Sequence, residues 1–438
     1  GHIVPVAMVG SVLPGGKKIS KGKLRGIPSN GMMCSAGELA INTEGLPEEQ
    51  VHGIYILPED TPIGIPAAAA LGLDDVVLEF ELTANRADCF SVIGIAREIA
   101  ALTGKQLRFP TIEVKETAPE SVAELAHIDI EAEELCRRFS ARVLRDVKIA
   151  PSPAWIVDRL HGADIRAINN VVDVTNFVML ELGQPLHAYD YDAVAGHSLT
   201  ARRAHAGEHL HTLDDSERIA VGDELVIADS EKPAGLAGIM GGLESEITER
   251  TTSVILEAAS FHGPTIRRTA RRIGLHSESS GRFERGVDET ETIRAVTRAA
   301  QLLAEMGACT VTRGIVDVYP KRRVPTVLEF SARTVGERIG ANIPGEWMAS
   351  ALRSLGFIVE EKGIEVFHVV VPSWRGDVTL MEDIAEEVAR LYGYDNIVSR
   401  LPLGAVQQGR TSERQDFVDL MRGTLAALGM TEELSFIF

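Results

Sequence analysis

Residues 169–190 read NNVVDVTNFVMLELGQPLHAYD, and they are the most informative stretch of this 438-residue sequence. Three shorter stretches follow along the chain: GIMGG at residues 238–242, VILE at 254–257 and GLHSESSGRFERG at 274–286. A single histidine or glutamate in any one of them would more often be a hydrogen-bonded structural residue than a catalytic one. The occurrence of all four stretches together, in this order, makes that interpretation less probable.

These stretches lie in the longest continuous α/β segment of the sequence, residues 125–320. Strand-like runs alternate there with helix-like runs and with many glycines. The segment is large enough for a hydrophobic core and a cleft. The predicted strands are residues 138–144, 224–228 and 253–257, and the predicted helices are residues 154–161 and 291–306.

The N-terminal part of the sequence has a different pattern. Residues 1–70 contain short strand-like runs cut by Gly and Pro turns, which predicts a small all-β barrel with a basic loop. Residues 77–82 alternate like a strand, and residues 91–102 carry an apolar face at helical spacing. Residues 111–123 are rich in Pro and Glu, and we expect a linker there.

A compact unit is predicted after residue 320. It has a strand at residues 326–330, two short helices that end at Gly340 and Gly356, and a hairpin that turns at residues 361–363. This order of elements is similar to a winged-helix module.

The last part of the sequence predicts an amphipathic helix at residues 412–428, closed by Gly429, and a strand at 434–438. An apolar strand at a chain end would be an unprotected sheet edge. We therefore expect the chain to be cut inside a further domain. If Gly1-His2 is a cloning scar, the true N-terminus is not visible either.

Composition narrows the class of protein. Hydrophobic residues make up 45% and charged residues 24%, as in ordinary globular proteins, and there is neither an apolar run of about 18 residues nor a secretory signal. The four cysteines are too far apart for a metal knuckle and too few for a disulfide framework, so we expect a cytoplasmic protein. The net charge of −19 argues against nonspecific coating of nucleic acid, although local basic patches exist.

The four stretches quoted above are similar to the editing module of the β subunit of bacterial phenylalanine–tRNA ligases. The resemblance covers nearly the whole chain and is strongest at residues 166–190, 238–286 and 372–397. It implies a multidomain α+β fold. The expected parts are a partial oligonucleotide-binding (OB-fold) β-barrel at 1–72, an α/β segment and linker at 73–123, a large α/β editing domain at 124–322, a winged-helix-like domain at 323–398 and the start of a class II synthetase-like domain at 399–438.

The resemblance also implies the residues of the editing pocket. In that family the pocket contains the histidine of the Gln-Pro-x-His stretch, an asparagine eleven residues before it, the first glycine of the Gly-Gly pair and the glutamate that ends the following strand. These are His187, Asn176, Gly241 and Glu257 in this sequence. Many relatives have alanine where this chain has Ser279, whose hydroxyl could tighten the pocket or add a hydrogen bond.

The chemistry of the two amino acids explains why such a pocket is needed. An apolar site built for phenylalanine rejects tyrosine by only about a hundredfold, because tyrosine merely adds a hydroxyl. A second pocket that bonds the hydroxyl can prefer tyrosine by ~10⁴–10⁵. We expect Glu257 to accept that hydrogen bond and the backbone near Gly241 to hold the acyl group. His187 and Asn176 could position the terminal adenosine or the attacking water.

Two basic groups are candidates for contact with tRNA. The stretch KLRGIPSNGMMCS at residues 23–35 is similar to the OB fold of tRNA-binding proteins, although a glycine-rich turn on a barrel is the plainer interpretation. A second basic stretch, residues 267–272, places four arginines on one side of a helix; they could face the tRNA acceptor end or pair with neighbouring carboxylates. The predicted tRNA-binding residues are Lys17, Lys18, Lys21, Lys23 and Arg25.

An acidic helix follows PSWRGDV at residues 372–378. Thr379 and Glu382 predict a capping box at its start, and Gly393 its end. From spacing alone, the acidic face of this helix is favoured to be solvated. The resemblance instead assigns four carboxylates to Mg²⁺ shared with the catalytic α subunit, and they are Asp377, Asp383, Glu386 and Glu387.

The resemblance implies a ligase with two α and two β subunits. In that assembly α joins phenylalanine to tRNA(Phe) with ATP, and β supports the assembly and hydrolyses mischarged Tyr-tRNA(Phe), so that tyrosine or phenylalanine is the small-molecule ligand. Nothing in this sequence looks like an ATP-binding catalytic core, so we expect no tRNA charging by this chain alone. Two alternatives stay open: a non-catalytic tRNA-binding scaffold and a free-standing trans-editing deacylase.

Overall fold

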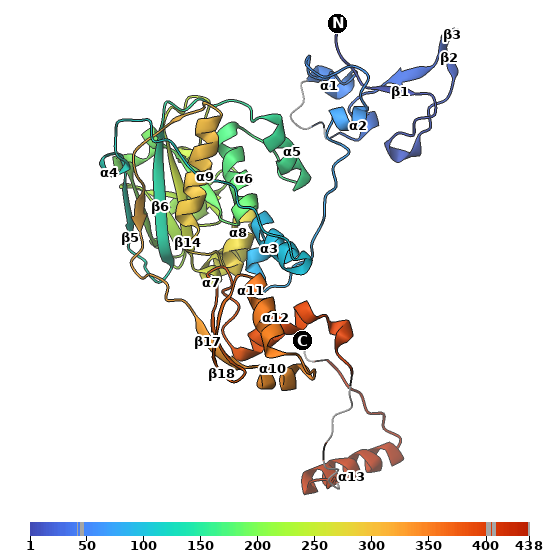
Figure 1. Cartoon of the computed structure of the whole chain (residues 1–438), viewed down its shortest axis with the longest axis vertical. Helices are drawn as coiled ribbons and strands as arrows, with labels where there is room; N and C mark the ends of the chain where they lie inside the picture. Colours follow the sequence, from blue (N-terminus) through green and yellow to red (C-terminus); the bar gives the residue numbers. More distant parts are fainter. Residues whose placement is uncertain (42, 44–47, 400–403, 405–408, 437–438) are drawn as a thin grey trace.

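The structure is a computed structural model that describes residues 1–41, 43, 48–399, 404 and 409–436. Its middle part has three layers, one of helices and two of β-sheet (Figure 1). The central layer is an antiparallel sheet with the order β15-β6-β14-β7, in which β16 also pairs with β6. Its strands are β6 (Cys136–Arg145), β7 (Leu186–Asp190), β14 (Val254–Phe261), β15 (Thr310–Val311) and β16 (Val316–Val318).

A second sheet packs against one face of the central sheet. Its order is β13-β12-β11-β8-β5, and only β5 and β8 pair in parallel. Phe139, Leu199 and Ile255 lie in the core between the two sheets. The strands are β5 (His127–Ile130), β8 (Ser198–Arg203), β11 (Leu225–Ala228), β12 (Pro233–Leu236) and β13 (Met240–Gly241).

Helices cover the other face of the central sheet. They are α5 (Ala154–Gly162), α6 (Asn170–Leu182) and α9 (Thr292–Glu305). Their buried side chains, such as Val174 and Leu303, form a second core with the strands. Two further helices follow β14, α7 (Gly263–Ile273) and α8 (Glu278–Arg285), and they contribute Ile266 and Phe283 to the core between the sheets.

Strand β14 is buried at every one of its eight positions. Because side chains alternate along a strand, Val254, Leu256 and Ala258 belong to the core under the helices, and Ile255 and Ala259 to the core between the sheets. Glu257 falls between Ile255 and Ala259. Its carboxyl group therefore enters the layer between the two sheets.

The strands and helices predicted in this middle part are confirmed. Residues 138–144, 224–228 and 253–257 fall in β6, β11 and β14, and residues 154–161 and 291–306 in α5 and α9. The helix predicted at residues 91–102 is also confirmed as α3 (Val92–Thr103), capped by the Ser91 side chain.

The strand predicted at residues 77–82 is wrong. The segment is extended, but it pairs with no strand among the described residues, and Val77, Leu78 and Phe80 are exposed. Alternation indicates an extended backbone with two different faces. It does not supply the neighbouring strand that a sheet requires.

Residues 1–72 form two small two-stranded sheets around a core of Ala7, Leu13, Ile19 and Cys34. Within the described residues these strands close no barrel, so the partial OB fold stays a prediction. The pairs are β1 (Val6–Met8) with β4 (Gly31–Met33) and β2 (Gly22–Leu24) with β3 (Ile27–Ser29), and the helices are α1 (Glu48–His52) and α2 (Ala67–Ala70).

The unit after residue 320 has a three-stranded sheet with the order β17-β19-β18. The predicted sequence of strand, two helices and hairpin is confirmed, whereas its likeness to a winged helix stays a prediction. Its elements are β17 (Val327–Ser331), α10 (Ala332–Ile339), α11 (Gly345–Ser354), β18 (Ile358–Gly363), β19 (Val366–Val370) and α12 (Met381–Tyr392).

The cap of α12 differs from the prediction. The capping box of Thr379 with Glu382 is wrong, because the helix begins at Met381 and the Asp383 carboxylate accepts the backbone N–H groups of Thr379 and Leu380 at 2.7 and 2.8 Å. An acidic residue one position later thus bonds the N–H groups of the N-cap residue Leu380 and of the residue before it. Gly393 does end the helix, with a φ of 90°.

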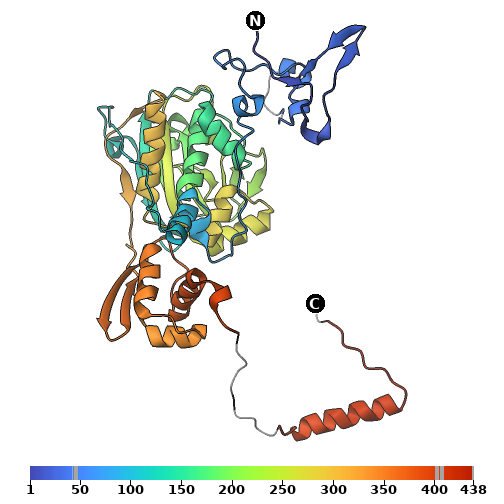
Figure 2. The ribbon, with the colours of Figure 1, turned by 45° about the vertical axis from the view of Figure 1, so that its right-hand side comes forward.

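Helix α13 (Glu413–Ala427) confirms the amphipathic helix predicted near the end of the sequence. None of its residues is buried, and Figure 2 shows it apart from the other elements. Residues 434–436 form no strand, and residues 437–438 lie outside the described residues. Within the described residues, no helix is both long and apolar enough to cross a bilayer.

We expect Leu303→Ala to lower the free energy of unfolding by about 2–5 kcal/mol, because Leu303 is fully buried between α9 and the central sheet. The matched control is Leu428→Ala, since Leu428 is 71% exposed; its expected effect is within about 0.5 kcal/mol. Urea unfolding followed by circular dichroism measures both. Equal effects of the two substitutions would contradict the packing described here.

Candidate active site

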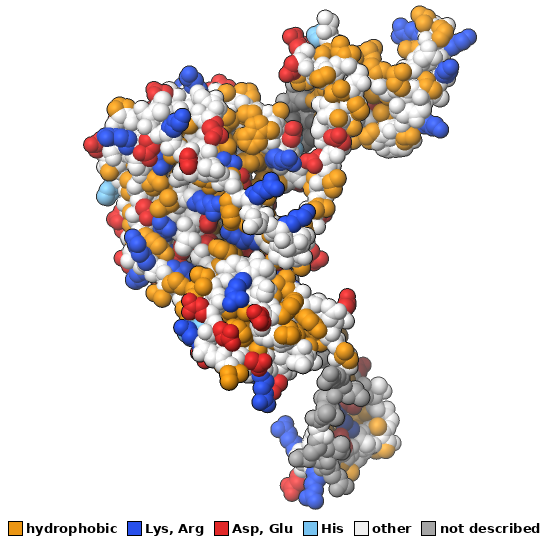
Figure 3. Space-filling model, in the orientation of Figure 1, with side chains coloured by type: hydrophobic (Ala, Val, Ile, Leu, Met, Phe, Trp, Pro, Cys, Tyr) orange, Lys and Arg blue, Asp and Glu red, His pale blue; other side chains and the backbone are white. Residues whose placement is uncertain are grey.

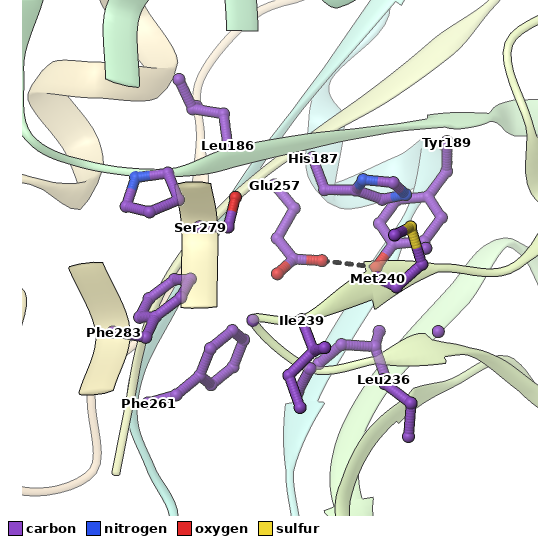
Figure 4. A pocket seen from close by; sticks show the side chains of 16 residues that line it. Leu186, His187, Tyr189, Leu236, Ile239, Met240, Glu257, Phe261, Ser279 and Phe283 are labelled. Atoms are coloured by element: carbon purple, nitrogen blue, oxygen red, sulfur yellow. Dashed lines mark hydrogen bonds between the residues drawn. The ribbon is translucent and has the colours of Figure 1, made fainter. Parts of the chain in front are cut away.

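A pocket opens between the two sheets, where strands β7 and β14 approach β12 and β13 (Figure 4). Helix α8 adds Ser279 and Phe283 to the wall. Most of the lining is apolar, with the side chains of Pro185, Leu186, Leu236, Ile239, Phe261 and Phe283.

Strand register brings the polar residues of the pocket together. His187 on β7 lies directly opposite Glu257 on β14, so the two side chains share one face of the sheet. Tyr189 lies two residues beyond His187 and therefore on the same face. Gly241 on β13 comes from the other sheet, where it pairs with Gly235.

Glu257 is the buried acid of the pocket, and only 5% of its surface is exposed. Its Oε2 accepts a hydrogen bond of 2.6 Å from the hydroxyl of Tyr189. Burial raises the pKa of Glu257 to about 7, because the ionised form loses its hydration, and the hydrogen bond from Tyr189 offsets only part of this. The other carboxyl oxygen points toward Phe283 and Phe261 (Figure 4) and has no hydrogen bond within the described part of the chain.

His187 packs against Tyr189, with ring centroids 4.4 Å apart in an edge-to-face arrangement. Burial lowers the pKa of His187 to about 4, so the imidazole is neutral near pH 7. A Cβ at position 241 would lie 2.7 Å from His187 Nε2, which explains why this position carries glycine. The ring is therefore held between Tyr189 and the backbone of Gly241.

Ser279 stands in the first turn of α8 and lines the pocket. Its hydroxyl lies 3.7 Å from the sulfur of Met179 on α6, to which it donates a weak hydrogen bond. The preceding Ser277 caps α8 by accepting the backbone N–H of Ser280. The Ser279 hydroxyl thus narrows the pocket on the side of α6.

Four of the five predicted pocket residues line the pocket: His187, Gly241, Glu257 and Ser279. Asn176 does not. It is a half-buried residue of α6, one turn before Met179. Tyr189 was not among the predicted site residues, although its position two residues after His187 on one strand was a signal for it.

Family models and known proteins match the sequence of this chain. The B3/4 domain family matches residues 135–308, which contain the pocket, and the tRNA synthetase B5 domain family matches residues 328–394. The phenylalanine–tRNA ligase β subunits of Moorella thermoacetica and Shouchella clausii are 45% and 44% identical to this chain over all 438 residues. The chain is a homologue of the phenylalanine–tRNA ligase β subunits.

The chain spans about half the length of these β subunits, 54% in both cases. A crystal structure of an N-terminal fragment of the phenylalanyl-tRNA synthetase β subunit from Pyrococcus horikoshii is 16% identical, with a TM-score of 0.37. That alignment covers 73% of this chain and 90% of the fragment. At this level of similarity, individual residues of the two chains are not matched to each other.

The basic residues predicted to bind tRNA are all exposed. Lys17, Lys18, Lys21, Lys23 and Arg25 lie around the β2–β3 hairpin, where Lys and Arg side chains gather at the upper right of Figure 3. Of the arginines on α7, Arg272 pairs with the buried Glu224, whereas Arg267 and Arg271 are exposed and form no ion pair with a described residue. Pairing with a carboxylate is thus confirmed for Arg272, whereas contact of this stretch with the tRNA acceptor end stays a prediction.

The four carboxylates predicted to bind Mg²⁺ do not converge. Arg375 binds Asp377 at 2.8 Å and Glu387 at 2.7 Å. Burial alone would raise the pKa of Glu387, but hydrogen bonds from Arg375 and Arg390 outweigh it and hold the pKa at about 2. Asp383 caps α12, and Glu386 is exposed. By their contacts, these residues do not fit a cation site made by this chain alone.

Instead, two of the four carboxylates, Asp377 and Glu387, belong to a chain of ion pairs that joins α12 to the segment around α3. Arg390 bridges Glu387 and Glu98, at 2.7 and 2.5 Å. Arg86 bridges Glu98 and Asp88. Because most of these groups are largely buried, each carboxylate needs its arginine partner.

The raised pKa of Glu257 predicts a pH-dependent effect of Glu257→Gln. A carboxyl whose folded pKa is about 7 and whose unfolded pKa is 4.5 gives its full stability below pH 4.5 and loses it as the pH rises through 7. We expect the glutamine variant to be more stable than the parent by about 3 kcal/mol at pH 8, and far less so at pH 5.

Hydrogen exchange of the β6 and β14 amides at the two pH values measures this difference locally. The lowered pKa of His187 also makes the stability depend on pH, with the opposite sign. Because His187 is present in both proteins, its effect cancels in the difference between them. A stability difference that is the same at pH 5 and pH 8 would contradict the burial of an ionisable Glu257.

Proposed function

We propose that this chain is part of the β subunit of a phenylalanine–tRNA ligase and that its pocket hydrolyses tyrosine wrongly joined to tRNA(Phe). The observation that carries the proposal is the buried Glu257 carboxyl, which has one oxygen bonded to Tyr189 and the other turned toward the aromatic wall. An aromatic side chain fits such a wall, and a phenolic hydroxyl can donate to the free oxygen.

Phenylalanine fits the same apolar space but has no hydroxyl. The free oxygen of Glu257 would then be buried without a donor, which costs about 1–3 kcal/mol or more for a charged group. A site of this kind discriminates far better than an apolar pocket that must exclude an extra hydroxyl. The pocket chemistry therefore supports tyrosine as the amino acid that is removed.

Hydrolysis requires water to attack the ester carbonyl, after which the bond between the carbonyl carbon and the ribose oxygen breaks. The ribose oxygen takes one proton of the water and becomes a hydroxyl, the other proton goes to solvent, and tyrosine leaves as a free carboxylate. A neutral His187, held between Tyr189 and Gly241, can orient the water or the ribose by hydrogen bonds. The glycine backbone at 241 admits the ester group closely. Since the ester is already activated, this positioning supplies much of the rate. Asn176, which lies on α6 outside the pocket wall, would help to position the terminal adenosine of the tRNA.

The wider assembly is proposed by the same reasoning. A catalytic α subunit would join phenylalanine to tRNA with ATP, in an assembly of two α and two β subunits in the cytoplasm. The exposed Lys17, Lys18, Lys21, Lys23 and Arg25, together with Arg267 and Arg271, offer phosphate contacts to tRNA(Phe). A Mg²⁺ shared with that subunit would use Glu386, which has no partner within the described residues, and would take its other ligands from the α chain.

Deacylation of tyrosyl-tRNA(Phe) by the 438-residue chain is the direct test. We expect hydrolysis well above the spontaneous rate and a strong preference over phenylalanyl-tRNA(Phe). A folded chain that hydrolyses neither ester would instead favour a non-catalytic scaffold.

We expect Glu257→Ala to reduce the preference for the tyrosyl over the phenylalanyl ester by about ten- to a hundredfold or more, since it removes the acceptor of the phenolic hydroxyl. Glu244→Ala is the control, because Glu244 is an exposed acid outside this pocket that pairs with Lys232. If the Glu257 variant clears tyrosyl-tRNA with the parent's selectivity, another group recognises the phenol.

Gly241→Ala should lower the deacylation rate about a hundredfold, because the added methyl group displaces the His187 ring from its place in the pocket. Gly423→Ala on α13 is the matched control, since a Cβ there meets no atom within 4 Å. Rates measured with excess enzyme isolate the chemical step. An unchanged rate for the 241 variant would exclude the close approach of His187 and Gly241 as a requirement.

A further inference from the structure

Tyr189 is a buried phenol that lies beside the proposed binding place of another phenol. Only 2% of its surface is exposed, and its ring is fixed by the edge-to-face contact with His187. Its hydroxyl donates to Glu257 Oε2 at 2.6 Å, a distance typical of a strong O–H···O⁻ hydrogen bond. The residue therefore bonds the same carboxyl group that the substrate would use.

We propose that Tyr189 is a positioning residue for substrate selection: its hydroxyl holds the Glu257 carboxylate ionised and turned so that the other oxygen accepts the phenolic hydrogen of the substrate. This inference rests on the proposed function and adds a residue to it. With tyrosine bound, the carboxylate lies between two phenols. With phenylalanine bound, the Tyr189 hydroxyl is the one phenol beside the carboxylate.

The surroundings of Glu257 explain why one hydrogen bond has this effect. The titratable groups that face it are His187 and Tyr189 on β7 and Cys136 on β6, and none of them carries a positive charge near pH 7. The pocket residues from β12, β13 and α8 are all uncharged. Tyr189 is thus the one hydrogen-bond donor to this carboxylate in the described chain. Without it, burial favours the protonated form even more strongly.

The decisive variant is Tyr189→Phe, which keeps the ring and removes only the hydroxyl. We expect the preference for free L-tyrosine over L-phenylalanine, measured by calorimetry from pH 6 to pH 9, to fall about ten- to a hundredfold at pH 7. The preference should return at higher pH, because the midpoint of its pH profile moves up by about one to two units. A structural defect alone would lower affinity at every pH.

Tyr191→Phe is the matched control. Tyr191 is another buried tyrosine whose hydroxyl donates to a neutral acceptor, the Leu125 carbonyl, at 2.9 Å. Its removal should leave the pH profile unchanged. In a Glu257→Gln background, which has no carboxylate to hold, Tyr189→Phe should have no further pH-dependent effect. Glu257→Asp, which draws the carboxylate back from Tyr189, is a second route to the same alkaline shift if the phenylalanine variant does not fold.

The outcomes separate this inference from the function on which it rests. If the parent prefers tyrosine and Tyr189→Phe has the parent's pH profile, the inference is wrong while the function stands. If the parent does not prefer tyrosine, the proposed function fails. The carbon-13 NMR titration of Glu257 then decides the role of Tyr189: a midpoint that rises in the variant supports it, and an unchanged midpoint overturns it.

Discussion

The burial of strand β14 on both faces is the constraint on which the functional region depends. Helices cover one face of this strand and a second sheet covers the other, so no side of it is solvated. The strand also pairs with β6 and β7, so it cannot shift to expose a side chain without losing two ladders of hydrogen bonds. Glu257, its one ionisable residue, has to remain in the layer between the sheets.

That fixed position determines the chemistry around Glu257. A carboxyl group in such a place is disfavoured as an anion, and the fold offers it one donor where two oxygens could accept. An apolar residue would stabilise the strand more. A position that breaks the local pattern at the expense of stability is where a functional role is expected. The neighbouring β7 adds the neutral imidazole of His187, and β13 adds Gly241. The two are so close that a larger residue at position 241 would collide with the imidazole ring.

Much of the central architecture could be predicted from the sequence, because apolar periodicity is a local property. The strands at 138–144 and 253–257 and the helix at 291–306 are of this kind. Features that need a partner could not be predicted in the same way. Residues 77–82 alternate but have no neighbouring strand, and Asp383 rather than Glu382 caps α12 because the chain enters that helix one residue later than the pattern suggested.

The pocket also has features that could be predicted from the sequence and features that could not. His187, Gly241, Glu257 and Ser279 were assigned by family resemblance. Strand register explains why His187 and Glu257 meet, and the packing of the two sheets brings Gly241 to His187. The hydrogen bond from Tyr189 to Glu257 joins residues 68 positions apart, and no spacing in the sequence predicts it. The ion pairs of Arg375 could not be predicted from the sequence either. Asp377 and Glu387, which were predicted to bind a cation, are instead neutralised by Arg375 and Arg390.

The chain of ion pairs between α3 and α12 has a consequence for how this polypeptide is made. Glu98 and Arg390 are 292 residues apart, and without Arg390 the two acids Asp88 and Glu98 share the single positive charge of Arg86. On the ribosome, Arg390 is synthesised 292 residues after Glu98, and during this interval Arg86 is the member of the network that can pair with Asp88 and Glu98. Closure of this network is therefore a late event in folding, and it reports that the compact unit after residue 320 has docked.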